Sequence, residues 1–273
     1  MKRGGGIVAR MIYISFGMLK SASTMLYQLT EEALRAAGRR PLVLGPPLRP
    51  RFSTTNYFDQ IDPALIARIQ AEAAGRDVVL KTHQRPHPDV AAMIASGQIM
   101  ASASIRDPRE IALSMIDHGA RSRRWGIAEF SECAGPADCL PSIDQQMESL
   151  AQWAAVPGVR VHGYNAICFG TARVVRDIAQ QAGLQIDAAA IAARFAGGRG
   201  VGQFSKGQAE RWREMDEATS SAFLARYADF HRDYGWQLHA GLPANGASNH
   251  RTAKGQLRQV AVDLYRLAQI RLR

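Results

Sequence analysis

Cysteine is scarce in this 273-residue chain, and long apolar runs and paired metal-ligand motifs are missing. The three cysteines, Cys133, Cys139 and Cys168, form no Cys-x-x-Cys pair and have no suitably spaced histidine, so the sequence predicts reduced thiols and no metal site. The spacing of Cys133 and Cys139 leaves open a small disulfide-closed loop. The apolar run at 11–16 is too short for a signal segment or a membrane span, so we expect a cytoplasmic protein.

The composition is that of a globular protein with excess positive charge. Apolar residues make up 47% of the chain, the net charge is +10, and no internal repeat or long linker interrupts it. We therefore expect one domain over residues 1–240 and a basic amphipathic tail over 241–273. Nucleic acid, an anionic membrane and a polyanionic small molecule would all suit this charge. The helix expected at 254–273 would contact a membrane, a twin subunit or its own domain.

Buried strands and helices alternate along the chain. Short β-branched runs bounded by turn residues predict the strands, and apolar residues at helical spacing predict the helices. This alternation is typical of an α/β fold whose central, mostly parallel sheet is flanked by helices and whose ligands bind at the carboxyl ends of the strands. The predicted strands are 11–16, 77–81, 98–105 and 159–162, and the predicted helices are 21–37, 109–118, 143–155 and 171–182.

A polar loop follows the first predicted strand, where the next helix begins. It contains Lys20, Ser21, Ala22, Ser23 and Thr24. The free N–H groups of a helix N-terminus, a lysine and three hydroxyls together predict a P-loop-like phosphate cradle. A serine-capped helix beside a surface lysine is the simpler alternative. A second glycine before the lysine is missing, which argues against an ordinary ATPase loop.

Two further strand ends carry charged residues. Arg106 follows the third predicted strand, and Ser114 lies on the next helix, so both are candidate phosphate ligands, although Arg106 and Asp107 could simply pair with each other. Lys81 and His83 end the second predicted strand on one face, which makes His83 a candidate base unless it is an ordinary surface or packing histidine. The other six histidines lack a lysine two residues away and have a weaker claim: His87, His118, His162, His231, His239 and His250.

These segments, in this order, resemble those of the sulfotransferases that use 3′-phosphoadenosine 5′-phosphosulfate (PAPS), of the cytosolic and bacterial type. The 20–24 loop is similar to the 5′-phosphosulfate loop K-S-G-T-T-W, and Lys81-Thr82-His83 is similar to the catalytic K-T-H segment. Arg106 and Ser114 match the 3′-phosphate motif R-x-P-R-[DE]-x-x-x-S. The 206–213 segment resembles K-G-x-x-G-x-W-[KR], and Tyr164 lies where the family has a tyrosine near the adenine.

The resemblance implies an enzyme that transfers a sulfuryl group from PAPS to a hydroxyl or amine of a small-molecule or glycan acceptor, without a metal and without nucleic acid as a partner. His83 is the implied base, and Lys20 and Lys81 are the implied catalytic cations. The implied donor-binding residues are Lys20, Ser21, Ala22, Ser23, Thr24, Arg106, Ser114, Tyr164, Lys206 and Gly207. A nucleotide-dependent kinase with Asp107 as a magnesium ligand and a non-catalytic basic binder remain as alternatives.

The chain departs from the family pattern at four positions. Ala22 replaces a glycine, Met25 replaces an adenine-stacking tryptophan, Ser205 replaces an arginine, and Asn165 replaces an acid. The acceptor-binding loop is expected at 121–141, where basic and aromatic residues would suit an acidic or carbohydrate acceptor.

Overall fold

A computed structural model describes residues 11–48, 55–198, 201 and 207–242 of the chain. Its sheet has the order β2-β1-β3-β4, and every adjacent pair of these strands is parallel. The strands are β1 (Ile12–Gly17), β2 (Val78–Thr82), β3 (Met100–Ile105) and β4 (Arg160–Gly163). The predicted α/β class with a parallel sheet is confirmed.

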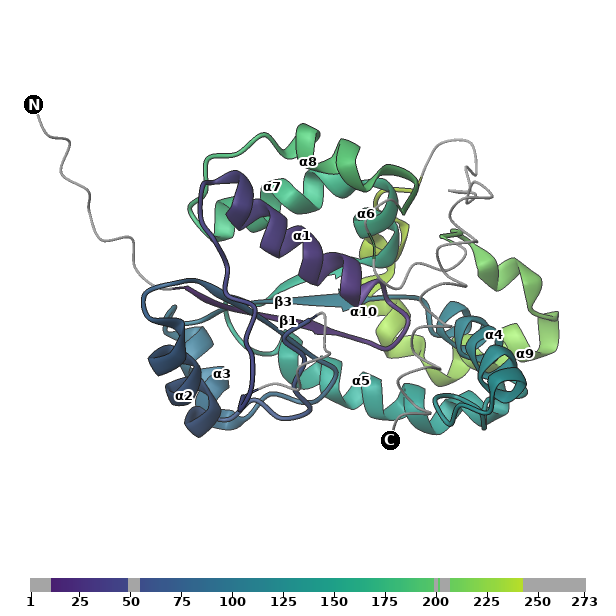
Figure 1. The fold of residues 1–273 in the computed structure, drawn as a ribbon. Helices are drawn as coiled ribbons and strands as arrows, with labels where there is room; N and C mark the ends of the chain where they lie inside the picture. The colour runs from purple at the N-terminus through teal and green to yellow at the C-terminus, as the bar shows by residue number, and fades with distance from the viewer. Residues whose placement is uncertain (1–10, 49–54, 199–200, 202–206, 243–273) are drawn as a thin grey trace, which may run out of the picture.

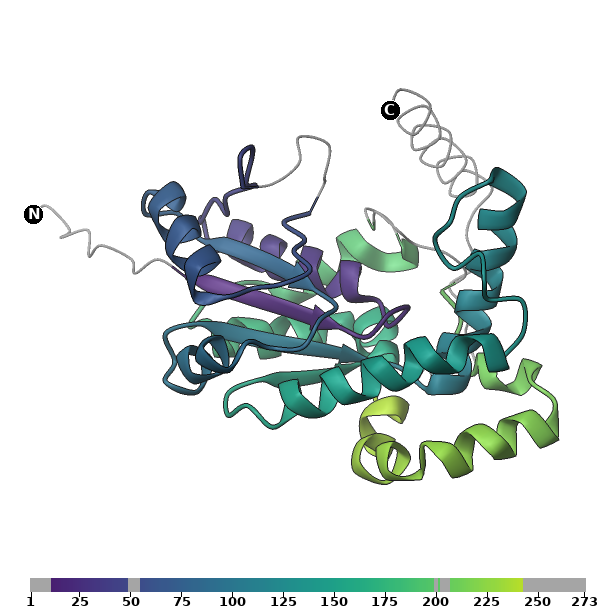
Figure 2. The same cartoon turned by 90° about the horizontal axis from the view of Figure 1, so that it is seen from below.

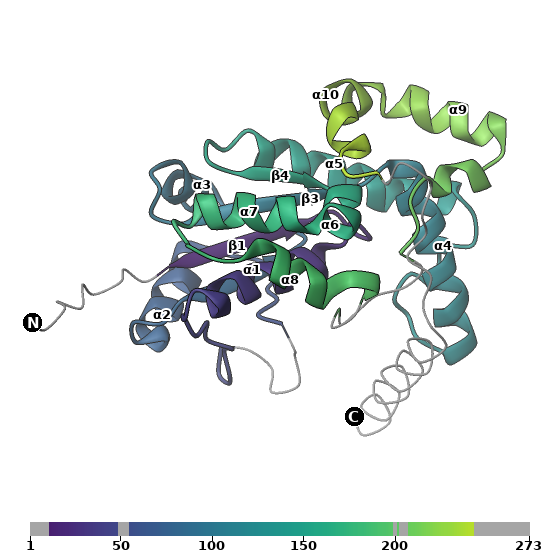
Figure 3. The same ribbon diagram turned by 90° about the horizontal axis from the view of Figure 1, so that it is seen from above.

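Helices cover both faces of the sheet (Figure 1). One face packs against α1 (Ser23–Ala36), α6 (Tyr164–Phe169), α7 (Thr171–Gln181) and α8 (Ala188–Phe195). The other face packs against α2 (Pro63–Ala73), α3 (Pro88–Ala95) and α5 (Leu140–Ala154). Seen from above, α7 and α8 lie in front of the sheet (Figure 3), and from below α5 crosses it (Figure 2).

Three more helices gather at the end of the sheet toward which the strands point (Figure 3). They are α4 (Pro108–Trp125), α9 (Glu217–Arg226) and α10 (Ala228–His239). Single-turn 3₁₀ helices, η1 (Ala137–Cys139), η2 (Ala196–Gly198) and η3 (Arg211–Glu214), complete the described elements. This end of the molecule is therefore where residues from distant parts of the chain meet.

The burial of β1 side chains on both faces explains the central position of this strand in the sheet. All six of its residues are buried, and its four large apolar side chains divide between two apolar cores. Ile12, Ile14 and Phe16 face the core under α5, whereas Tyr13 faces the core under α1 and α7. Successive side chains of a strand point to opposite faces, so an apolar run of this kind suits a strand buried on both sides.

The helix after β3 is longer than predicted. It was expected to end near His118 but continues to Trp125, where Gly126 adopts a left-handed conformation as the C-cap (φ +64°). The expected acceptor loop at 121–141 therefore includes the last turn of α4, η1 and the start of α5. The irregular segment between these helices is 126–136, called here the 126–136 loop.

The predictions about the tail, a membrane span and the cysteines have the following outcomes. Beyond residue 242, the predicted tail and its 254–273 helix lie outside the described residues, so the domain boundary at residue 240 stays a prediction. No helix within the described ranges is long and apolar enough to cross a membrane. All three cysteines are free thiols in this structure, and the side chains of Cys133 and Cys139 are buried.

Candidate active site

The site lies where β1, β2 and β3 end side by side. Gly17 ends β1, Thr82 ends β2 and Ile105 ends β3, and parallel pairing brings these ends to one edge. The 17–24 loop, His83 and Arg106 leave the sheet at this edge. Three segments that are up to about ninety residues apart in the sequence thus meet, as the parallel topology predicts.

The 17–24 loop has a conformation suited to an anion. Lys20 and Ala22 both adopt left-handed backbone angles (φ +62° and +67°), and Ala22 is the N-cap of α1 without a side-chain cap. Alternation of left- and right-handed residues turns successive N–H groups toward one point, and the N-terminus of α1 adds its partial positive charge there. The loop therefore forms a concave donor site of the kind that holds phosphate oxygens.

Ser21 does not face this concave site with its hydroxyl, contrary to the prediction. Its Oγ donates to the carbonyl oxygen of Met18 at 2.6 Å and lies 2.6 Å from Oγ of Ser104, and its side chain is fully buried. The hydroxyl is occupied in holding the loop against β3. The prediction of a donor-binding hydroxyl rested on residue type alone and did not take this local hydrogen bond to the backbone into account.

Gly17 is needed for the close approach of the loop to the sheet. A Cβ atom at this position would lie 2.3 Å from Cβ of Ser23 and 2.4 Å from Oγ of Ser104. Both distances are far below van der Waals contact, so any other residue would push α1 away from β3. The glycine thus fixes where α1 begins relative to the strand ends.

Lys81 places a buried cation under the start of α1. Its side chain is 5% exposed, and its Nζ donates to Oγ1 of Thr24 at 2.8 Å. Thr24 belongs to the first turn of α1, so a lysine at the end of β2 reaches across to the adjacent helix N-terminus. Two sources of positive potential therefore act at the same place.

His83 is held with one ring nitrogen free of the loop. Its Nδ1 lies 2.6 Å from the carbonyl oxygen of Gly17, and because a carbonyl only accepts, Nδ1 carries the hydrogen and Nε2 has the lone pair. Burial, followed by the charge of Lys81, lowers the pKa of His83 to about 4. The imidazole is then neutral at pH 7. The ring of Tyr57 lies beside it, with the centroids 5.5 Å apart.

Lys20 points toward α4 and the 126–136 loop. Its Nζ lies 2.5 Å from Nδ1 of His118 and 4.8 Å from the ring centroid of Phe130. No role was predicted for His118, because it stands 98 residues from Lys20 and has no lysine or arginine two residues away on either side. Its position four residues after Ser114 on one helix face was the available signal.

Arg106 joins three segments of the site. Its Nε donates to Oε2 of Glu110 at 2.8 Å, and its Nη1 and Nη2 donate to the carbonyl oxygens of Lys20 and Gln208, both at 3.2 Å. The guanidinium also lies 3.7 Å from the ring centroid of Tyr164. The simple pairing of Arg106 with Asp107, the alternative from the sequence, is wrong, because the partner is Glu110.

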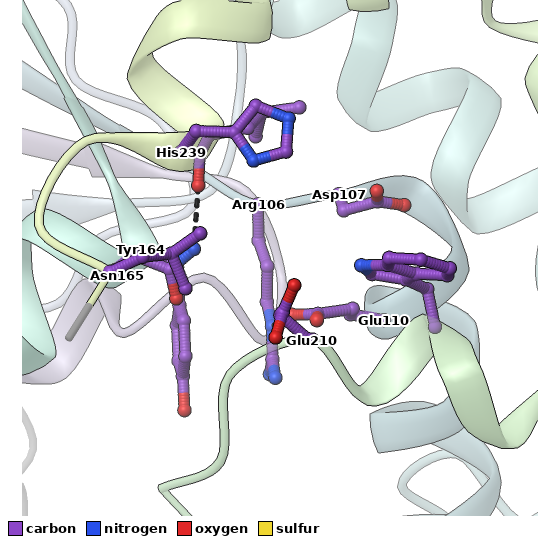
Figure 4. Close-up of a pocket in the computed structure, with 10 residues that line it drawn as sticks. Arg106, Asp107, Glu110, Tyr164, Asn165, Glu210 and His239 are labelled. Carbon is purple, nitrogen blue, oxygen red and sulfur yellow. Dashed lines mark hydrogen bonds and ion pairs between the residues drawn. The ribbon is translucent and has the colours of Figure 1, made fainter. Parts of the chain in front are cut away.

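A small pocket opens next to Arg106 (Figure 4). Tyr164 and Asn165, which directly follow β4, line it together with Trp212 of η3 and residues at the end of α10. Asn165 donates from Nδ2 to the carbonyl oxygen of Leu238 at 2.5 Å, which ties the end of β4 to α10. Tyr164 thus stands beside Arg106, and the nucleotide-binding role of both residues stays a prediction.

The other residues predicted to bind the donor have fewer defined contacts with the site. Ser114 is half-buried on the face of α4 that carries Glu110 and His118, four residues from each. Gly207 is buried with a left-handed backbone (φ +59°) next to Gln208. Lys206 and Ser205 lie outside the described residues. Within the described ranges, no group of three or more histidine, cysteine, aspartate or glutamate side chains is arranged to hold a metal.

No family model matches the sequence, and no curated protein matches it either. Solved structures do resemble the fold. Retinol dehydratase in complex with androsterone and the inactive cofactor PAP (adenosine 3′,5′-bisphosphate) is 17% identical, with a TM-score of 0.53 over 83% of this chain and 82% of that one.

A second retinol dehydratase structure, with retinol and PAP, is 16% identical, with a TM-score of 0.54 over 83% of this chain and 82% of that one. Mouse sulfotransferase SULT7A1 complexed with PAP is 12% identical, with a TM-score of 0.56 over 84% of this chain and 88% of that one. The chain therefore has the α/β sulfotransferase fold.

Proposed function

We propose that this chain is a PAPS-dependent sulfotransferase that acts on a hydroxyl or amine of a small molecule. The observation that carries the proposal is the neutral His83, whose Nε2 is available beside Lys81 and the 17–24 loop. A base next to an anion cradle is what transfer of an anionic group to a hydroxyl requires. The likeness to structures solved with PAP supports this choice of donor.

The residues of the site fit a donor with phosphate groups at two positions. The left-handed Lys20 and Ala22, the uncapped start of α1 and the buried Lys81 suit the 5′-phosphosulfate. Arg106, next to the pocket that Tyr164 lines, suits the 3′-phosphate and the adjoining ribose and adenine. Glu110 holds Nε of Arg106, which leaves its two Nη groups to exchange backbone carbonyls for phosphate oxygens.

The protein has two chemical tasks, which are to remove a proton and to stabilise negative charge. The bound donor supplies an activated sulfuryl group. His83 accepts the proton of the attacking hydroxyl or amine at Nε2, while Nδ1 keeps its bond to Gly17 and fixes the ring. Lys20, Lys81 and the N–H groups of α1 stabilise negative charge that develops near the loop.

The kinase alternative assigned a magnesium ion to Asp107, and the geometry of this residue opposes it. Oδ1 and Oδ2 of Asp107 accept from Nε and Nη2 of Arg109 at 3.0 and 2.6 Å, and Oδ1 also caps α4 through the N–H of Arg109. Both oxygens are therefore occupied in a structural ion pair at the helix start. The alternative of a basic binder rests on the 254–273 segment, which lies outside the described residues.

A small, apolar hydroxyl compound is the acceptor that we favour over a glycan. Retinol and androsterone, the molecules in the retinol dehydratase structures, support this class. The rings of Tyr57 and Phe130 lie beside His83 and Lys20, and aromatic side chains are a usual lining of sites for small molecules.

Calorimetric titration with PAP and with AMP tests the proposal. PAP should bind more tightly than AMP, because the 3′-phosphate adds contacts to Arg106, and Arg106→Ala should remove most of that difference. Hydrogen bonds to charged groups contribute about 1.5 to 3 kcal/mol, so the loss should be roughly 10- to 150-fold. Arg68→Ala, at an exposed arginine of α2, is the control. Equal affinities of the parent for PAP and AMP would refute the nucleotide assignment.

A further inference from the structure

The most informative contact that the proposed mechanism does not use lies between Lys20 and His118. His118 belongs to α4, two turns beyond Glu110, and its side chain is 19% exposed. Lys20 Nζ can only donate, so Nδ1 of His118 at 2.5 Å accepts and Nε2 carries the hydrogen. The hydrogen on Nε2 faces the carboxylate of Glu129, whose Oε2 is 3.7 Å away. His118 therefore links the loop lysine to the 126–136 loop.

Phe130 packs against both Lys20 and His118. Its ring centroid is 4.8 Å from Nζ of Lys20 and 5.0 Å from the ring centroid of His118. Phe130 holds a left-handed backbone (φ +61°), which is unfavourable for an aromatic residue. The fold thus accepts strain at the residue that shields the lysine and the histidine.

The 126–136 loop is fastened to α4 and is not a free lid. Ser122 donates to the carbonyl oxygen of Glu129 at 2.5 Å, and Arg123 donates to the carbonyl oxygens of Ser131 and Cys133 at 2.7 and 3.1 Å. A Cβ at Gly119 would lie 2.3 Å from the carbonyl oxygen of Phe130, so the loop lies directly on the helix there. These contacts fix Phe130 and Glu129 relative to His118.

We propose that His118 is a positioning residue that holds the Lys20 ammonium at the site of transfer, with the 126–136 loop as its support. This inference rests on the proposed function, in which Lys20 contacts the 5′-phosphate side of the donor. The Nζ atom of a lysine lies at the end of a chain with four rotatable bonds. Holding it in place before the ligand arrives reduces the conformational entropy that is lost on binding. His118 acts on the donor through Lys20.

A double-mutant cycle read by PAP binding tests this role without any acceptor. Lys20→Ala should weaken PAP binding at least tenfold, and His118→Ala should weaken it about fivefold. In the Lys20→Ala background, His118→Ala should change the affinity less than twofold, because the lysine that it positions is gone. His118→Asn keeps an acceptor atom on a shorter side chain and should recover part of the loss. Arg68→Ala, on the exposed side of α2, should bind PAP like the parent.

Nitrogen-15 NMR of the parent protein at pH 8 supplies a readout that does not depend on any ligand. The His118 ring should show an unprotonated Nδ1 and a protonated Nε2. A protonated Nδ1, or PAP affinity unchanged by His118→Ala while Lys20→Ala weakens it, would overturn the positioning role and leave the proposed function standing. A parent protein that does not bind PAP would overturn both, whatever the tautomer of His118.

Discussion

His83 should titrate near pH 4, far below an ordinary histidine. Burial disfavours the imidazolium, and the nearby Lys81 repels it, so the pKa is lowered from 6.5 to about 4. At pH 5.5, an imidazole with a pKa of 6.5 is neutral in about a tenth of molecules, whereas one with a pKa of 4 is neutral in about 97%. A base of this kind stays competent in mild acid.

Proton NMR of the imidazole Cε1–H signal between pH 8 and pH 5 measures this directly, with His83→Asn as the spectrum that assigns the peak. The His83 signal should move by only about a tenth of its full titration shift by pH 5. Lys81→Met removes the repelling charge and should raise the pKa, which stays below 6.5 because burial is the larger cause. A midpoint near pH 6.5 in the parent protein would refute the assignment of a buried, neutral base.

The kinetic consequence follows from the same geometry. His83→Ala should lower turnover with a hydroxyl acceptor by a factor of about 10² to 10⁴, the usual size of a general-base contribution. PAP affinity should fall only by the worth of one loop support, the Nδ1 hydrogen bond to Gly17, which is about 0.5 to 1.5 kcal/mol or roughly two- to tenfold. Full turnover in the variant would mean that another group takes the proton, and lost PAP binding would mean that the ring serves mainly to hold the loop.

Three further predictions concern stability. Ala22→Gly should raise the free energy of unfolding in urea by about 1 kcal/mol, because a left-handed backbone strains alanine but not glycine; a loss would contradict the strain. Gly17→Ala should destabilise the fold by several kcal/mol or prevent folding, because the new Cβ would overlap Ser23 and Ser104, and a normal melting curve would contradict that packing. Burial lowers the pKa of His162 to about 4, so between pH 6.5 and pH 4 this imidazole binds a proton mainly in the unfolded chain, and the folded protein loses stability as the pH falls through this range. His162→Gln should remove roughly 3 kcal/mol of that acid-induced loss of stability. A variant with the same dependence of stability on pH as the parent would count against this role of His162.

The sequence predicted the sheet well because its signals are local. Each strand is a short apolar run, and the topology of parallel strands brings their ends together without any knowledge of side-chain contacts. The start of α4 was equally local, since Asp107 and Pro108 are typical N-cap and N1 residues. The end of α4 at Trp125 was missed, because Ser122 and Arg123 near its end donate hydrogen bonds to the 126–136 loop, and periodicity does not reveal such contacts.

Side-chain partners were predicted less well than positions. Residue type suggested that the Ser21 hydroxyl would face a ligand, but a carbonyl three residues back was the nearer partner. The alternative pairing of Arg106 with Asp107 is wrong, because Arg106 directly precedes the N-cap of α4 and its Nε donates to Glu110, four residues along. In both cases the fold of the backbone determines which polar group is in reach, and residue type does not reveal this.

The predicted motifs are joined in the structure by contacts that no single motif reveals. Each donates one hydrogen bond to the 17–24 loop: His83 to the carbonyl oxygen of Gly17, Lys81 to Oγ1 of Thr24, and Arg106 to the carbonyl oxygen of Lys20. The loop is therefore held in its strained shape before any ligand arrives, which reduces the reorganisation that binding must offset. It also means that these side chains are coupled through the loop they share. Replacing any one of them alters the support of the others, so their effects on PAP binding should not add.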